Sequence, residues 1–252
     1  MRIAAPLSAV AAIFIVCQAL AADEPARVAL TVAAFSSTAP GSMPAGWTSL
    51  AFRGIERLTR YEIVADVERR SVMRATSAAS ASALIRHLDV DPRAHPILRW
   101  EWKIDNLIRN ADVTRREGDD YPARIYVSFK YDPSRVSWFD RAAYAAIRLF
   151  YGEYPPHAGL NYIWDGKAAR GTVVPNPHTS RVAMIIVESG DERLRQWRSY
   201  ERNIVDDYRR AFGEDPPPIS GIGIMTDSDN TRESASASYG DITLSAAGDG
   251  KR

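Results

Sequence analysis

The sequence predicts a mostly β protein, an antiparallel β-sandwich of the jelly-roll type with two short inserted helices. Apolar and polar residues alternate with a period of two in many short segments, as strands with one buried face require. Glycine and proline separate these segments, and the regular strand–helix alternation of a doubly wound sheet is missing. About ten such strands in 252 residues indicate one sandwich domain with a substantial core.

The clearest alternation runs from residue 97 to residue 105. Leu98, Trp100 and Trp102 point to one face, with charged residues between them. Residues 123–131 repeat this pattern. Because Trp100 and Trp102 alternate with charged residues, we expect both tryptophans in the core and not as a stacking platform for sugars. Further strands are expected near residues 47–53, 61–66, 71–76, 82–88, 160–165, 181–188, 220–226 and 237–245.

Three segments depart from simple alternation. Residues 181–188 are continuously apolar before their final glutamate, which predicts a central strand covered on both faces. Residues 137–151 carry an apolar stripe at helical spacing and predict the first inserted helix. Residues 203–212 predict the second, with Asn203 as its N-cap and Gly213 at its C-terminal end.

The N-terminal segment has the pattern of a secretory signal peptide. Residues 1–21 are apolar after a basic start and end on Ala19-Leu20-Ala21, a small-x-small cleavage pattern. A membrane anchor is the alternative, although the apolar run is marginal for spanning a bilayer. We expect cleavage after Ala21, a periplasmic or secreted location, no membrane association afterwards, and one β-sandwich domain over residues 22–252.

Charge and cysteine content exclude several classes of protein. Lys and Arg total 32 against 31 Asp and Glu, so the excess of positive charge that a nucleic-acid binder needs is missing. The 46% of hydrophobic residues argue against a disordered chain. The one cysteine, Cys17, lies in the expected leader, so the mature chain would have neither disulfides nor thiol chemistry.

Short motifs occur in a recognisable order along the mature chain. They are Gly46-Trp47, Ser80-Ala81-Ser82, Trp100-Glu101-Trp102-Lys103, Gly118-Asp119-Asp120, Ala123-Arg124-Ile125-Tyr126-Val127, Asp206-Asp207-Tyr208, Phe212-Gly213, residues 225–231 and Tyr239-Gly240-Asp241-Ile242. As a set they resemble a bacterial exported family known only as domain of unknown function 3047. That resemblance implies no established activity and therefore supplies no catalytic residues.

The C-terminal segments have a second, architectural resemblance. Residues 221–230 and 239–244 are similar to the last two strands of galactose-binding-like jelly rolls. Many carbohydrate-binding modules share that fold, although one fold hosts many functions.

The two alternating strands offer the first candidate binding surface. If these strands are neighbours, Arg99, Glu101 and Lys103 lie beside Arg124 and Tyr126 and could bind an anionic or hydroxyl-rich ligand. The alternative, which we favour, is a solvated outer face with cross-strand ion pairs.

Paired carboxylates offer the second candidate site. Asp119 and Asp120 precede a strand, and either could act with Glu101 and Arg124 in a glycan hydrolase or lyase. Adjacent residues on an extended chain point to opposite faces, however, which argues against a dyad. We favour a turn in which these side chains bond to the backbone.

A third candidate is a structural calcium site. The segment 227–231 has the alternating oxygen ligands that begin a calcium loop; its candidate ligands are Asp227, Asp229 and Asn230, and Asp241 could complete the set. The EF-hand pattern fails because Arg232 occupies its glycine position, and such loops are common without metal. We expect no other cofactor, since the sequence contains no HExxH motif, phosphate-binding loop or dinucleotide fingerprint.

The sequence therefore predicts an exported, soluble β-sandwich that binds a saccharide or another envelope-associated ligand without catalysis. A polysaccharide hydrolase or lyase is the alternative, and a structural envelope protein is a third class.

Overall fold

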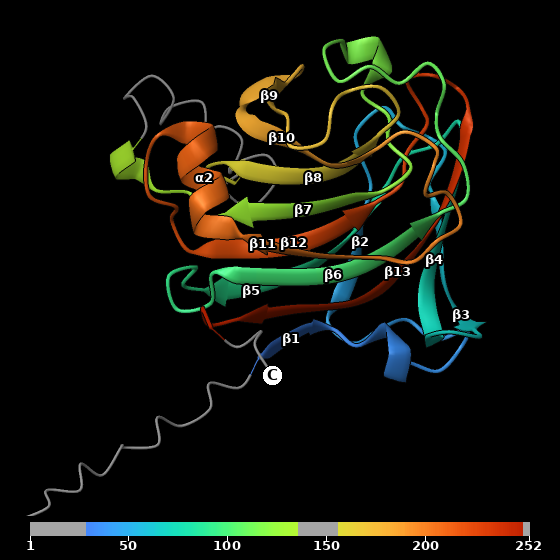
Figure 1. Ribbon diagram of the computed structural model, residues 1–252, viewed down its shortest axis with the longest axis horizontal. Coiled ribbons are helices and arrows are strands. Elements are labelled where there is room, and N and C mark those ends of the chain that lie inside the picture. Colours follow the sequence, from blue (N-terminus) through green and yellow to red (C-terminus); the bar gives the residue numbers. More distant parts are fainter. Residues whose placement is uncertain (1–28, 136–155, 249–252) are drawn as a thin grey trace, which may run out of the picture.

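Two β-sheets pack face to face in the computed structural model, which describes residues 29–135 and 156–248 (Figure 1). Sheet A contains β1 (Leu30–Ala33), β3 (Arg60–Asp66), β4 (Arg70–Ala78), β6 (Ile97–Ile104), β11 (Arg198–Asn203) and β13 (Ser234–Ser245). Sheet B contains β2 (Trp47–Leu50), β5 (Ala83–Val90), β7 (Arg124–Phe129), β8 (Gly159–Asp165), β9 (Val173–Asn176), β10 (Thr179–Ser189) and β12 (Ile219–Met225). The mostly β sandwich predicted from the sequence is confirmed.

Strand order explains how distant segments meet. Sheet A has the order β11-β6-β13-β4-β3, with β1 paired to β13, and sheet B has the order β2-β5-β12-β7-β8-β10-β9. All pairs are antiparallel except β8 with β10, which run parallel. The predicted leader and the predicted helix at 137–151 lie outside the described residues.

Aromatic side chains from both sheets form the centre of the core. Trp100 and Trp102 of β6 are 1% and 0% exposed, which confirms that they are core residues. The ring of Trp100 lies 5.2 Å from that of Tyr162 on the opposite sheet and 5.3 Å from that of Tyr200 on β11. The alternation in β6 thus places its aromatic residues between the sheets and its charged residues outside.

Strand β10 is buried on both faces, as its apolar run predicts. Ile185 and Val187 belong to the main core, whereas Met184 and Ile186 pack in a second cluster with Tyr121. A continuous apolar run is therefore needed here, because residues 183–187 are buried whichever face of the strand they occupy.

The helix α2 (Ile204–Phe212) lies across one end of β7 and β8 (Figure 1). Asn203 caps its N-terminus by accepting hydrogen bonds from two backbone N–H groups, and Gly213 ends it in the left-handed region at φ 74°. Tyr208 is buried against Phe129, with ring centroids 4.7 Å apart. Three short 3-10 helices complete the described elements: η1 (Phe35–Ser37), η2 (Arg116–Gly118) and η3 (Pro133–Arg135).

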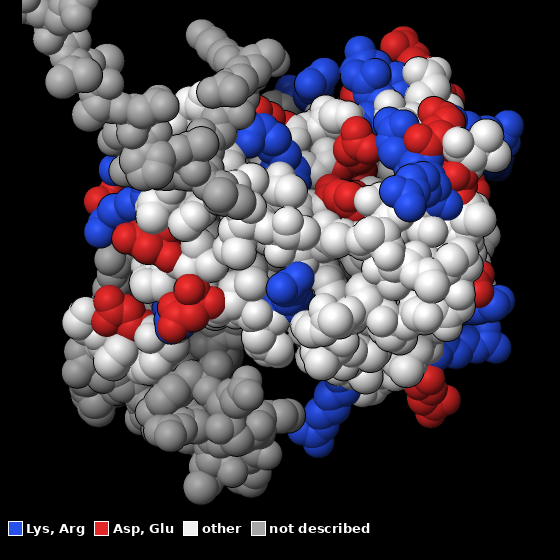
Figure 2. Space-filling view, turned by 90° about the horizontal axis from the view of Figure 1, so that it is seen from below, with Lys and Arg blue, Asp and Glu red and all other residues white. Residues whose placement is uncertain are grey.

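Acidic and basic side chains are interspersed on the face that Figure 2 presents, and its middle is largely uncharged. This distribution agrees with the balanced charge of the sequence. Among the described residues, no helix combines the length and the apolar character needed to cross a bilayer.

Candidate functional site

A cleft of about 630 Å³ lies on the outer face of sheet B. Its floor follows from the pattern of β12, where Ile222 and Ile224 point into the core and Gly221 and Gly223 point outward. Because glycine has no side chain, the outer face of the sheet is hollow along this strand. The neighbouring strands then supply the side chains that line the hollow.

Strand register aligns four side chains in a row beside Gly223. That glycine pairs with Ile85 of β5 on one side and with Tyr126 of β7 on the other. Tyr126 pairs with Asn161 of β8, which in turn pairs with Met184 of β10. Ile85, Tyr126 and Asn161 line the cleft, which changes from apolar to polar along this row, whereas Met184 is buried beneath its edge.

Two groups in this row are available to a ligand. Asn161 is buried, and its Oδ1 has no hydrogen-bond partner within the described residues. Burial raises the pKa of Tyr126 to about 12, so its hydroxyl stays neutral and can donate a hydrogen bond. Gly159 leaves the space for this hydroxyl, because a Cβ there would lie 2.5 Å from Tyr126 Oη.

An apolar wall borders the row on the side of β2 and β5. Leu50 ends β2, and Phe52 and Ile55 follow it in the loop that leads to β3. Leu50 is 43% exposed, so its side chain is accessible to a ligand in the cleft. An exposed apolar strip beside buried polar atoms is typical of a binding surface.

A buried arginine organises the charged end of the cleft. Arg124 donates from Nε to Asp227 Oδ1 at 2.8 Å, and its Nη2 contacts the other oxygen of the same carboxylate. The guanidinium also faces Asp119, with Nη1 3.4 Å from Oδ1, and lies over the ring of Tyr121. Arg124 is 5% exposed, so these partners and not solvent satisfy its charge.

The adjacent Asp119 and Asp120 turn away from each other after η2. Asp119 lines the cleft, where His178 Nε2 lies 3.5 Å from its Oδ2 and Asn176 donates to the same oxygen at 3.1 Å. Asp120 instead accepts backbone N–H groups from Asn230 and Thr231. The backbone N–H of Asp120 donates to the carbonyl oxygen of Gly118, so this segment forms the turn that the sequence favours.

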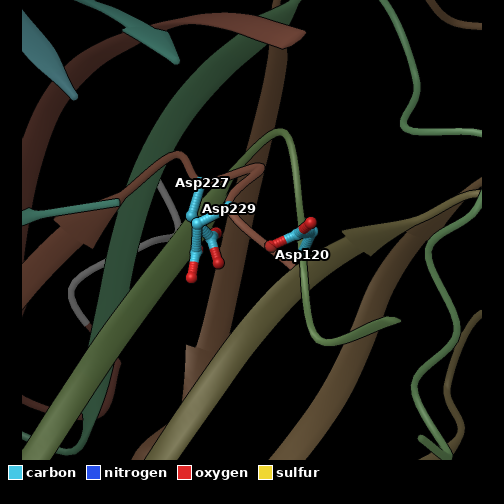
Figure 3. Close-up of side chains that lie close together, drawn as sticks. All are labelled: Asp120, Asp227 and Asp229. Atoms are coloured by element: carbon cyan, nitrogen blue, oxygen red, sulfur yellow. The ribbon is translucent and has the colours of Figure 1, made fainter. Parts of the chain in front are cut away.

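Three carboxylates lie close together, as Figure 3 shows, and two of them, Asp227 and Asp229, line the cleft. Oxygens of Asp120, Asp227 and Asp229 lie within 4.8 Å of one another. Burial, together with the neighbouring Asp120, raises the pKa of Asp227 well above its ordinary value despite the contact with Arg124. Burial and Asp120 raise the pKa of Asp229 as well. Carboxylate oxygens are the ligands that calcium prefers, so this cluster is where a calcium ion would fit.

Asp241 does not join this cluster. It lies on β13 in sheet A, where its carboxylate accepts hydrogen bonds from the backbone N–H and the hydroxyl of Ser36. Asn230 lines the cleft, and its backbone N–H donates a hydrogen bond to the carboxylate of Asp120. The structure thus brings Asp120 to Asp227 and Asp229 in the place where the sequence suggested Asp241.

The predicted basic surface is divided between opposite sheets. The surface required the strands at 97–104 and 124–131 to be neighbours, and this condition is not met, because β6 belongs to sheet A and β7 to sheet B. Arg99 and Lys103 of β6 face outward and contact carboxylates of Glu201 and Asp66. Such pairs agree with the solvated face of cross-strand ion pairs that we favour.

Glu101 is likewise separated from the other candidate acids. Its carboxylate accepts hydrogen bonds from Arg69 Nε at 2.6 Å and from the hydroxyl of Ser199 at 2.8 Å. Because it lies on the outer face of sheet A, it cannot act with Asp119 or Arg124 on one substrate. Of the predicted ligand-binding residues, only Arg124 and Tyr126 line the cleft.

Several residues of the cleft were not singled out from the sequence. They are Phe52, Asn161, Asn176 and His178. The signal for the floor was present in Gly221-Ile222-Gly223-Ile224, where glycine occupies each outward position. Asn161 lies within a buried strand, and a polar residue there also points to a special role.

In a comparison with known protein families, residues 45–243 match the family described as "Protein of unknown function (DUF3047)". A search of curated proteins finds no match to this chain. Among solved structures, the family 11 carbohydrate-binding module of the cellulosomal cellulase Lic26A-Cel5E of Clostridium thermocellum is similar at a TM-score of 0.44. The two sequences are 13% identical, and the alignment covers 88% of this chain and 96% of that one.

Two further solved structures have similar arrangements. The family 30 carbohydrate-binding module of the cellulase Cel9D-Cel44B of Clostridium thermocellum gives a TM-score of 0.42 at 8% identity, covering 88% and 99% of the two chains. The K1 cleaved adhesin domain of Lys-gingipain from Porphyromonas gingivalis W83 gives 0.38 at 13% identity, again covering 88% and 99%. Because these scores and identities are low, the function of the cleft has to be argued from its own residues.

Proposed function

This chain belongs to the family of proteins of unknown function that matches residues 45–243, and we propose that it binds a saccharide in the cleft of sheet B without catalysis. The observation that carries the proposal is the row across the cleft floor. There the Oδ1 of Asn161 lacks a partner among the described residues, and it lies one strand from the hydroxyl of Tyr126.

A sugar ring fits both parts of this cleft. Its hydroxyl groups can donate to the Oδ1 of Asn161 and accept from Tyr126, which satisfies a buried acceptor that is otherwise costly. Its C–H faces can pack on the apolar wall formed by Leu50, Phe52 and Ile55. The cleft can therefore contact both the hydroxyl groups and the apolar C–H face of a pyranose ring.

The charged end of the cleft favours a neutral saccharide. The guanidinium of Arg124 is buried and already bound to Asp227 and Asp119, so it is not free to bind a carboxylate of a ligand. Asp119 and Asp229 also line the cleft and would repel an acidic sugar. We therefore expect this cleft to bind neutral oligosaccharides more tightly than uronic-acid oligomers.

Calorimetric titration with neutral gluco-, xylo- and galacto-oligosaccharides and with oligogalacturonates tests this proposal. For the neutral ligand that binds, Asn161→Ala and Tyr126→Phe should each weaken the affinity about tenfold, because each removes one hydrogen bond to the sugar. Gly159→Ala should weaken binding as well, by displacing the hydroxyl of Tyr126. Ser199→Ala on sheet A is the matched control and should leave affinity unchanged.

Absence of saturable binding across the panel would contradict the proposal. Binding that is equally strong in Asn161→Ala, Tyr126→Phe and the control would contradict the cleft as its location. Circular dichroism of each variant checks that the fold is retained.

A polysaccharide hydrolase or lyase is the second candidate, and one observation favours it. Asp119, with His178 beside its carboxylate, lies in the same cleft as Asp229, whose pKa is raised by burial and by Asp120. Acids in different environments are the usual arrangement for general acid–base work. Incubation with neutral and acidic polysaccharides should release new reducing ends or unsaturated products that Asp119→Asn abolishes. Without such products, the enzyme hypothesis fails.

We also propose that calcium binds at Asp120, Asp227 and Asp229. The supporting argument is their mutual proximity and the electrostatic cost of three neighbouring carboxylates, which a divalent cation would relieve. Calcium should raise the melting temperature of the protein, and Asp229→Asn should reduce that rise. Asp206 is an exposed acid on α2 and provides the control. If calcium raises the melting temperature of Asp229→Asn as much as that of Asp206→Asn, the effect of the ion is nonspecific.

Export is the remaining part of the proposal. It rests on the sequence of residues 1–21, which ends on Ala19-Leu20-Ala21. Expression in a bacterial host should deliver a chain beginning at Ala22 to the periplasm or medium, as fractionation and N-terminal sequencing would show. A cytoplasmic chain that retains Met1 would contradict it.

A further inference from the structure

A second depression, of about 550 Å³, lies where β4 ends and β13 begins. We propose that it is an oxyanion site, which takes a carboxylate, phosphate or sulfate group of a ligand. Three arginines line it: Arg57, Arg109 and Arg232. Its location, lining and charge differ from those of the cleft, so the inference does not rest on the proposed saccharide binding.

The three arginines carry charge that the described chain does not neutralise. None of them forms an ion pair within the described residues, whereas Arg60, Arg74 and Arg99 on the strands of sheet A are each paired with a carboxylate. The one acid in the lining, Glu233, uses both carboxylate oxygens to accept the backbone N–H groups of Arg109 and Asn110. Three positive charges against one negative leave the depression with a net positive charge of two.

Backbone conformation is unusual at the same place. Ala79 and Arg232 both line the depression, and both have positive φ, at 48° and 59°. Only four non-glycine residues in the described chain have positive φ, so two of the four meet here. A conformation that is unfavourable for a side-chain-bearing residue persists only where its surroundings impose it, and such residues gather at functional sites.

A buried network of serines holds this turn in place. Ser77 Oγ donates to the carbonyl oxygen of Ser80 at 2.8 Å and lies 2.6 Å from the hydroxyl of Ser228. Ser80 Oγ accepts the backbone N–H of Ala78 at 3.0 Å, and Ala79 N–H donates to the carbonyl oxygen of Glu233 at 2.8 Å. The base of the depression is therefore fixed before any ligand arrives, which lowers the entropic cost of binding.

The chemistry of guanidinium groups indicates what this site takes. Arginine presents N–H donors in a planar fork that matches the oxygens of carboxylate, phosphate and sulfate groups. The arginines are exposed, so binding should be moderate and should weaken as the salt concentration rises. Asn106 also lines the depression, where its Nδ2 donates to the carbonyl oxygen of Ser234 at 2.8 Å.

Titration of the full chain with inorganic phosphate and with trigalacturonate, followed by amide NMR at low salt, tests the proposal. Saturable shifts should appear at Ala79 and Glu233 with at least one probe. Arg57→Gln and Arg109→Gln should each weaken binding about tenfold. Arg232→Asn should do the same while keeping a residue that tolerates positive φ. Arg170→Gln, at an exposed arginine outside both depressions, is the matched control.

The two probes distinguish the source of the anionic group. Binding of phosphate with loss in the arginine variants identifies a small-anion site, and stronger binding of trigalacturonate identifies an acidic glycan. Failure of both probes, or binding that no arginine variant weakens, would overturn the proposal. Shifts confined to Tyr126 and Asn161 would place the probe in the cleft and would also overturn it, whereas loss of neutral-sugar binding alone would not.

Discussion

At the scale of single residues, Arg124 determines the shape of the charged end of the cleft. Its guanidinium contacts Asp227 and Asp119, which belong to segments more than a hundred residues apart. The strong coulombic attraction of these acids outweighs burial, and the pKa of Arg124 is raised above its already high value. The side chain is therefore a permanent buried cation whose role is to position two carboxylates.

We expect Arg124→Leu to lower the free energy of unfolding by about 3 kcal/mol or more. The substitution leaves Asp227 buried without its counter-charge, and breaking one side of a buried pair is strongly destabilising. The same kind of change at the exposed pair of Arg60 and Glu62, as Arg60→Leu, should cost no more than about 1 kcal/mol. Urea unfolding of both variants checks the difference, and equal losses would contradict the role of Arg124.

Glu188 should link stability to pH. Burial would raise the pKa of Glu188, but hydrogen bonds from Tyr200, the backbone of Ser189 and Arg193 outweigh burial, so its pKa is lowered from 4.5. A carboxyl whose pKa is lower in the folded state stabilises the protein above its unfolded pKa, and this contribution is lost as the pH falls through the folded pKa. Acidification below the ordinary value should therefore destabilise the native chain.

Glu188→Gln tests this linkage. The variant should be less stable at pH 7 by about 1–2 kcal/mol, and the loss of stability on acidification should be shallower than in the native chain. Glu192→Gln, at an exposed position, should change the unfolding free energy by less than about 0.5 kcal/mol. Parallel pH profiles for Glu188→Gln and the native chain would exclude the linkage.

At the scale of elements, the strands with strong alternation were predictable from the sequence. The expected segments near 71–76 and 97–105 correspond to β4 and β6, because their buried faces leave a clear periodic pattern. Three strands were missed: β1, β9 and β11. Strand β9 is short and contains Pro175 at a sheet edge, and β11 is a charged edge strand in which only Tyr200 is buried.

Strand pairing explains why the candidate site was only partly predictable. Periodicity shows which residues share one face of a strand, but it does not show which strands are neighbours. Arg99 and Arg124 were therefore grouped on one surface, although β6 and β7 lie in opposite sheets. Tyr126 and Asn161 are neighbours because β7 pairs with β8. No pattern in the sequence of either strand predicts that pairing.

The N-cap of α2 offers a prediction at this scale. The side chain of Asn203 accepts hydrogen bonds from the N–H groups of Val205 and Asp206 at 3.0 and 3.3 Å. Asn203→Ala removes both bonds and should lower the free energy of unfolding by about 1 kcal/mol. The same substitution at the exposed Asn110 should stay within about 0.5 kcal/mol. Thermal unfolding of the two variants checks this prediction. Equal unfolding midpoints would contradict a stabilising role of Asn203 as the N-cap.

At the scale of the whole molecule, the folded unit extends beyond the segment that matches the family. The match begins at residue 45, yet β1 pairs with β13 and closes one side of sheet A. Val32, Ala33 and Phe35 are 0% exposed and belong to the main core. The hydrogen bonds from Ser36 to Asp241 join the same segment to β13. The N-terminal segment is therefore part of the sandwich.

A chain that begins at residue 45 should consequently be less stable than one that begins at residue 29. Burial of a large apolar side chain contributes about 1.5–3 kcal/mol, so loss of Val32 and Phe35 should cost about 4 kcal/mol. The urea m-value should fall as well, because less surface is buried on folding. In the full chain, Phe35→Ala should cost about 3–5 kcal/mol and the exposed Ser37→Ala almost nothing, which tests the same contact if the shortened chain does not fold. Equal unfolding midpoints for the two chain lengths, or for Phe35→Ala and Ser37→Ala, would show that β1 contributes nothing to the sandwich.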